Sequence, residues 1–169
     1  MSLRPQDVLV VLKLTVEDDR PAYAQLAAEL GLSSSQAHQS VRRAAESGLL
    51  VPGALRVNRR ALEEFLIHGL KYVFPARRGP LARGVPTAHS APPLDKLIVD
   101  DGPPLVWPDS EGTVRGETLE PIYKTAPMAA RRDPRLYVPL VLVDAIRVGR
   151  ARERKLATEK LQELLARAP

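Results

Sequence analysis

Apolar positions recur at helical spacing along the first 74 residues, and the period is then lost. The spacing predicts helices over 7–14, 21–30, 34–47 and 59–72. Before the last of these, two short β-prone runs flank Pro-Gly, which suits the centre of a type II turn. This part of the chain is therefore expected to be mainly helical with one small hairpin.

Cap residues support the second and third helices. Pro21 suits the first position of a helix, and Gly31 suits the left-handed residue that ends one. Ser33 is followed three residues later by Gln36, which is the pattern of a capping box. Asn58 is placed to cap the fourth helix, on which His68 is expected to be partly buried.

The third predicted helix has two different faces. At ~100° per residue, alanines and Val41 fall on one side. The other side has no large apolar residue and carries Ser35, His38, Gln39, Arg42 and Glu46, with Gln36 and Arg43 on its flanks. The predicted base contacts are Ser35, Gln36, His38, Gln39 and Arg42. Side chains of these types hydrogen-bond to base edges in the major groove. For His38, simple solvent exposure is an equal alternative to a contact with a base or phosphate.

Two short helices around a glycine turn, followed by a hairpin, resemble the winged helix-turn-helix regulators of bacteria, of the MarR and GntR type. The residues that carry the resemblance lie within 4–58 and are Leu26-Ala27, Leu30-Gly31-Leu32-Ser33, Val41 and Gly48-Leu49-Leu50-Val51. The resemblance implies a cytoplasmic regulator of transcription that binds double-stranded DNA. A homodimer on a pseudo-palindromic site is expected, because one short helix reads too few base pairs alone. The expected phosphate contacts are Arg43, Arg56, Arg59 and Arg60.

Proline dominates the middle of the chain, with twelve of sixteen prolines between Pro75 and Pro139. This density disfavours long helices, so residues 75–135 are expected to form an ordered, extended arm around apolar clusters. Arg77, Arg78 and Arg83 are candidate contacts of such an arm with a minor groove. The favoured alternative is a surface loop whose arginines are solvated or paired with the acidic stretch 95–123. A further hypothesis places a ligand pocket around Trp107 and Tyr123.

Residues 136–169 are predicted to be a basic helical tail, capped at Asp133 and either kinked or delayed by Pro139. The phrase DAIRVGRARERKLA (144–157) resembles small stand-alone helix-turn-helix proteins paired with nucleotidyltransferase-like partners in toxin–antitoxin operons. This weaker resemblance implies an alternative function, an antitoxin that neutralises a toxin-like partner through the arm and tail. Arg147, Arg150 and Arg154 are the candidate partner or dimer contacts. A solvated helix face is the plainer alternative.

The composition of the chain excludes several further classes of functional site. The chain has 169 residues, 44% of them hydrophobic, and a net charge of +5. It has no cysteine, which excludes disulfides, thiol catalysis and cysteine-based zinc sites, and its three histidines are scattered. No catalytic motif, cofactor motif, signal peptide or membrane-spanning run is present, so no enzyme, metal, cofactor or membrane contact is predicted. The expected fold is mainly α with a small β wing. It divides into a winged helix-turn-helix over 1–74, an arm over 75–135 and a tail over 136–169.

Overall fold

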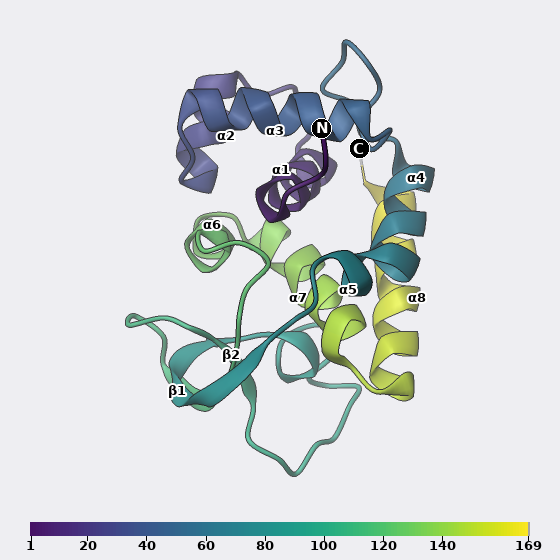
Figure 1. The fold of residues 1–169 in the computed structure, drawn as a ribbon. Helices are drawn as coiled ribbons and strands as arrows, with labels where there is room; N and C mark the ends of the chain where they lie inside the picture. The colour runs from purple at the N-terminus through teal and green to yellow at the C-terminus, as the bar shows by residue number, and fades with distance from the viewer. Residues whose placement is uncertain (169) are drawn as a thin grey trace.

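The computed structural model describes residues 1–168 and is mainly α-helical with one small β-sheet (Figure 1). Its elements are α1 (Pro5–Val16), α2 (Tyr23–Leu30), α3 (Ser34–Glu46), α4 (Arg59–Glu64), the π-helix η1 (Phe65–Gly69), α5 (Leu70–Val73), β1 (Arg78–Pro86), the 3₁₀ helix η2 (Ala88–Ser90), β2 (Leu105–Pro108), β3 (Val114–Leu119), α6 (Ala126–Arg132), α7 (Pro134–Val148) and α8 (Ala151–Arg167). The prediction of a mainly α fold with a little β structure is confirmed. None of the helices among residues 1–168 combines the length and apolar character that crossing a membrane requires.

The first three helices lie where the sequence predicts them, with one difference. α1 lies under α3 (Figure 1), and its residues from Val8 to Leu12 are fully buried. α2 begins at Tyr23 rather than Pro21, because Ala22 has an extended backbone (φ −64°, ψ 150°) and is the N-cap. Pro21 is buried in the loop before the helix, so it does not form the first turn.

The predicted hairpin is present but shorter than expected. Leu50 and Val57 form a single antiparallel bridge, flanked by two backbone hydrogen bonds of 2.8 Å. The turn between them has Gly53 at φ +74°, and the Ala54 N–H donates to the carbonyl of Val51, as a type II turn requires. The two expected strands are thus reduced to one bridge around the predicted turn.

The helix predicted over 59–72 changes its hydrogen-bond pattern midway. It starts as α4 behind the N-cap Asn58, whose side chain accepts from the Ala61 N–H, and widens into the π-helix η1. Leu62, Leu66 and Leu70 are buried on one line at a spacing of four. The wider turn of a π-helix brings this spacing onto one face. His68 is exposed, so the expectation of partial burial was wrong.

The proline-rich middle forms a closed three-stranded sheet. β1 pairs antiparallel with both β2 and β3, and β2 pairs in parallel with β3. The strands approach so closely that a Cβ at Gly84 would lie 1.9 Å from the Trp107 carbonyl oxygen. A Cβ at Gly116 would lie 2.2 Å from the Pro104 carbonyl oxygen, so both positions require glycine. Residues 78–84 of the basic segment belong to strand β1 and do not form a loop.

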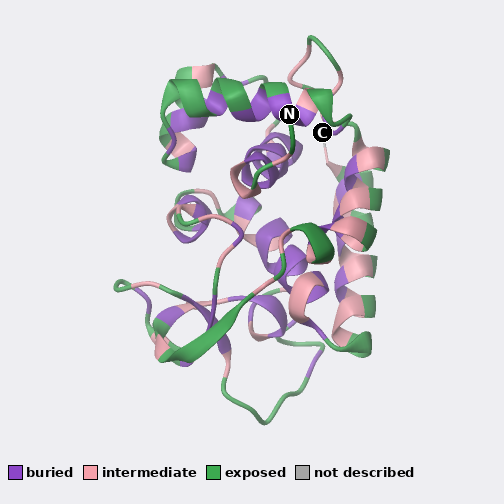
Figure 2. Ribbon diagram, in the orientation of Figure 1, coloured by how far each residue is buried: buried purple, intermediate pink, exposed green. Residues whose placement is uncertain are grey.

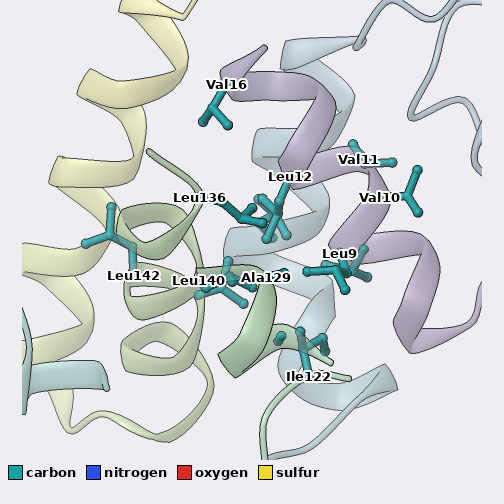
Figure 3. Close-up of a cluster of buried hydrophobic side chains, with 14 of the residues drawn as sticks. Leu9, Val10, Val11, Leu12, Val16, Ile122, Ala129, Leu136, Leu140 and Leu142 are labelled. Carbon is teal, nitrogen blue, oxygen red and sulfur yellow. The ribbon is translucent and has the colours of Figure 1, made fainter. Parts of the chain in front are cut away.

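The C-terminal segment is part of the core. It contains two helices, and α7 starts at Pro134 with Asp133 as its N-cap, so Pro139 lies inside the helix and does not delay it. α7 is buried on nearly all sides between α1, α6, α8 and the sheet (Figures 1 and 2). Leu12 of α1 packs beside Leu136 and Leu140 of α7 (Figure 3). The expectation of a narrow apolar stripe on a peripheral tail was therefore wrong for α7.

A buried lysine joins α1, α2 and the start of α7. The Lys13 ammonium lies 2.6 Å from Glu17, 2.9 Å from Glu29 and 2.6 Å from Asp133. Burial alone would lower the pKa of Lys13, but its three carboxylate partners raise it above its usual value. Burial likewise opposes ionisation of Asp133, but hydrogen bonds from Lys13 and Arg135 hold its pKa below the usual range. The Lys13 ammonium, 2.9 Å from a Glu29 oxygen, also lowers the pKa of Glu29.

A buried carboxylate joins α7 to the sheet and to the helices before it. Asp144 is 1% exposed and accepts hydrogen bonds from the Thr87 hydroxyl and the Trp107 indole, both at 2.7 Å. Its other oxygen accepts from Arg147 at 2.9 Å, and Arg147 also donates to the Phe74 carbonyl. Burial raises the pKa of Asp144, while Arg147 and the two neutral donors oppose that rise.

Removing the Asp144 carboxylate is expected to destabilise the fold strongly. Asp144→Ala leaves the Arg147 guanidinium, the Trp107 N–H and the Thr87 hydroxyl buried without their partner. The expected loss is about 3–5 kcal/mol in the free energy of unfolding, measured by urea denaturation. The exposed Asp101→Ala is the control and should change stability little. Equal stabilities of the two variants would contradict the role assigned to Asp144.

The stability of the fold is expected to fall in acid. Asp133 and Glu29 have lowered pKa values in the folded state, so their stabilising effect is present above the unfolded pKa and is lost as pH falls through the folded one. The free energy of unfolding should therefore decrease below about pH 4. Urea denaturation over a pH series should give a shallower decrease for Glu29→Gln than for the exposed control Glu159→Gln. Identical pH profiles of the two variants would show that Glu29 does not contribute.

Candidate nucleic-acid interface

The turn between α2 and α3 is fixed by its backbone and by packing. Gly31 has φ +66°, the left-handed conformation predicted for it, and the Leu32 N–H donates to the Ala27 carbonyl at 2.9 Å. The Leu32 side chain is buried below the turn. A Cβ at Gly31 would lie 2.6 Å from Met128 of α6, so the turn also packs against the middle of the chain.

The predicted capping box at the start of α3 is confirmed. The Gln36 N–H donates to the Ser33 hydroxyl at 3.1 Å, and the Gln36 side-chain oxygen accepts from the Ser33 N–H at 2.9 Å. This hydrogen bond occupies the Gln36 amide oxygen. The capping bond holds the Gln36 amide oxygen in place, which leaves its NH₂ as the freer group for a base contact.

The burial of α3 follows the two predicted faces. Ala37, Val41 and Ala44 are buried, whereas all five side chains predicted to contact bases, at positions 35, 36, 38, 39 and 42, are exposed (Figure 2). Gln39 is exposed and has no side-chain hydrogen bond to any residue within 1–168. Both polar ends of its amide are therefore available to a ligand.

Two of the exposed side chains of α3 contact other side chains in the structure. His38 stacks on Tyr23 of α2, with ring centroids 3.6 Å apart and planes 14° apart. Arg42 pairs with Glu46 one turn later at 3.0 Å, and this pairing lowers the pKa of Glu46. An exposed pair of this kind contributes little to stability, so Arg42 can be redirected to a ligand at small cost.

A groove separates α3 from the tip of the hairpin. It has a volume of about 740 Å³, and its lining includes Tyr23, His38, Gln39, Arg42 and Leu55. The hairpin projects beside the C-terminal end of α3 (Figure 1). Four of these lining residues lie on α2 or α3, so the exposed face of α3 forms one wall of the groove.

The arginines predicted to contact phosphates differ in burial and in the charge that surrounds them. Arg56 and Arg60 are exposed near the hairpin, and Arg59 is half-buried. Arg56 and Arg59 line a second cavity of about 660 Å³ together with the acidic residues of the loop 17–20. The charge in that cavity is therefore mixed rather than purely positive.

Arg43 is a structural residue, and its prediction as a phosphate contact was wrong. Its guanidinium donates to both oxygens of Asp7 at 2.8 and 2.7 Å, with the residues 2% and 0% exposed. Asp7 also accepts from the Arg4 N–H at the start of α1. Pairing with Asp7 raises the pKa of Arg43, so the ion pair stays formed and fixes α3 on α1.

The arginines predicted for the arm lie far from α3. Arg77, Arg78 and Arg83 are exposed in and beside β1, which lies at the opposite end of the molecule (Figure 1). Arg78 pairs with Glu117 of β3 at 3.3 Å. This pairing agrees with the favoured alternative, in which surface arginines are paired with the acidic stretch 95–123.

The three arginines predicted as partner contacts of the tail also differ in burial and in their hydrogen-bond partners. Arg147 has a side chain only 3% exposed and holds Asp144, so its prediction as a partner contact was wrong. Arg154 is half-buried and donates to the Gly149 carbonyl, whereas Arg150 is exposed. Trp107 is 1% exposed and its indole N–H donates to Asp144, so this side chain is part of the core.

Comparison with known proteins adds no identification: no protein-family model, curated protein or solved structure matches this chain. The geometry of α2, α3 and the hairpin is therefore the basis for assigning a function.

Arg42 and Arg43 are adjacent, and their substitutions are expected to have opposite consequences. Arg43→Ala leaves Asp7 buried without its partner and should lower the free energy of unfolding by about 3–5 kcal/mol. Arg42→Ala removes only an exposed pair and should leave stability nearly unchanged. Urea denaturation of both variants measures the difference. Similar stabilities would show that the Asp7–Arg43 pair does not hold α3 in place.

Proposed function

We propose that this chain is a transcription regulator that binds double-stranded DNA, with α3 as the recognition helix of a winged helix-turn-helix. The hairpin over 49–58 is its minimal wing. The observation that supports this proposal is the exposed face of α3, which carries only hydrogen-bonding or charged side chains. Its buried face holds the helix against α1 and α2.

The side chains on this face differ in the base contacts they can make. Gln39 has both amide groups available and fits the bidentate contact with adenine. Arg42 fits the bidentate contact with the two acceptors of guanine once it leaves Glu46. Ser35, Gln36 and His38 lie on the same exposed surface and are proposed to make single contacts, and the exposed Arg56 and Arg60 are the proposed phosphate contacts near the wing.

A rigid helix is needed for such readout, because a small displacement misaligns bidentate contacts. Three interactions fix α3: the capping box at Ser33, the glycine turn at Gly31 and the buried pair of Arg43 with Asp7. The proposed regulator acts as a homodimer, because one helix of this length reads too few base pairs for specificity.

We do not extend the proposal to the antitoxin alternative. That function requires the arm and the tail to wrap a partner. In this chain, β1 belongs to the closed sheet and α7 is enclosed by other elements, so both already serve the fold.

The proposal predicts loss of sequence readout when the face of α3 is truncated. A preferred duplex is first selected from a random pool with the full chain, and binding is then titrated by fluorescence anisotropy at several salt concentrations. Gln39→Ala and Arg42→Ala are each expected to weaken binding by about 1–3 kcal/mol and to relax discrimination at one base position.

A matched control variant distinguishes base recognition by α3 from non-specific electrostatic attraction to the DNA phosphates. Arg152→Ala removes an exposed arginine from α8 and should leave the preferred sequence and its affinity nearly unchanged. An unchanged preference in both α3 variants would overturn the assignment of α3. Equal affinity of the full chain for all duplexes, falling steeply with salt, would reduce the function to attraction by phosphates.

A further inference from the structure

Three side chains that are distant in the sequence come together beside the N-terminus of α8. His89 lies in η2, Asp100 in the loop 91–104 and Glu153 in the first turn of α8. One donor atom from each lies within 4.8 Å of the other two. We infer that these residues bind a divalent transition-metal ion of the zinc class.

The imidazole of His89 is buried, and one of its nitrogens has no hydrogen-bond partner among residues 1–168. Its side chain is nine-tenths buried, and its Nε2 lies 2.8 Å from an Asp100 oxygen. That contact lacks hydrogen-bond geometry, and Nε2 has no hydrogen-bond partner within 1–168. In a metal site, the ion lies along the nitrogen lone pair and the carboxylate oxygens lie to one side of it. The Asp100 oxygen lies close enough to Nε2 for both atoms to bind one ion.

Backbone groups orient both carboxylates. The Gly102 N–H donates to one oxygen of Asp100 at 2.9 Å, while the other oxygen lies next to His89. The Arg150 N–H donates to one oxygen of Glu153 at 2.5 Å, which leaves the second oxygen available. Outer hydrogen bonds of this kind are typical of metal-binding carboxylates, because they fix the ligand before the ion arrives.

The donor set selects the class of ion. One imidazole nitrogen with two carboxylates suits zinc and neighbouring transition metals, whereas magnesium and calcium prefer oxygen ligands alone. Two negative charges compensate a divalent cation, although the nearby Arg150 weakens this attraction. Asp100 is 43% exposed, so the donor atoms can close onto an ion at the ~2.0–2.2 Å that zinc requires.

A bound ion would connect the loop 91–104 and η2 to the first turn of α8. The loop 91–104 leaves η2 and returns to β2, while Glu153 belongs to the helix that packs along α7. Three protein ligands leave at least one coordination position for water. The proposed ion therefore holds the loop on α8 and remains accessible from solvent.

The test is a titration of the full chain, freed of any purification tag, with zinc chloride by isothermal calorimetry. We expect one ion per chain and a rise in the melting temperature, because the ion binds the folded state. Magnesium chloride under the same conditions should produce neither effect. Absence of zinc binding, or a stoichiometry well above one, would overturn the inference.

Variants locate the bound ion. His89→Ala should weaken zinc binding at least tenfold, while the exposed His68→Ala is the matched control and should bind as the unaltered chain does. Glu153→Gln keeps an oxygen for the Arg150 N–H and is the variant to use if His89→Ala does not fold. It should also lose affinity at least tenfold. Zinc binding that survives Glu153→Gln, or that His68→Ala weakens equally, would contradict the site.

Discussion

The buried carboxylate of Asp144 connects parts of the chain that are far apart in sequence. It binds Thr87 at the end of the first strand, Trp107 in the second strand and Arg147 on its own helix. Arg147 in turn holds the Phe74 carbonyl, where the N-terminal helices end. A buried charge is tolerated only when it is paired and hydrogen-bonded. The sheet, α7 and the end of α5 therefore keep these positions together, and the elements that carry the candidate interface rest on the same core.

The charged residues of this chain divide into two groups that composition does not separate. Lys13, Arg43 and Arg147 are buried among carboxylates and join helices to one another. Arg42, Arg56 and Arg60 are exposed and remain available to a ligand. The net charge of +5 is the difference between 25 basic and 20 acidic residues, so it does not show which cations are buried in ion pairs and which are exposed. In the proposed function, the exposed group contacts DNA and the buried group keeps α3 rigid.

The candidate interface and the proposed metal site lie in different parts of the fold. α3 and the hairpin lie at one end of the molecule, whereas the strands of the closed sheet lie at the other (Figure 1). α7 runs between them and contacts α1 on one side and η2, which carries His89, on the other. The two assignments therefore rest on separate residues, and failure of one leaves the other standing.

Several local features can be predicted from the sequence: the capped start of α3, the left-handed Gly31, the turn at Gly53 and the two faces of α3. Each follows from residues within a few positions of one another, through backbone conformation and helical period. The roles of the charged and titratable residues depend instead on packing between distant segments. Arg42 and Arg43 are neighbours in sequence, but Arg43 meets Asp7 across 36 residues. His89, Asp100 and Glu153 meet only when the loop after η2 packs against α8. Burial and pairing depend on such long-range packing, for which a local pattern carries no signal.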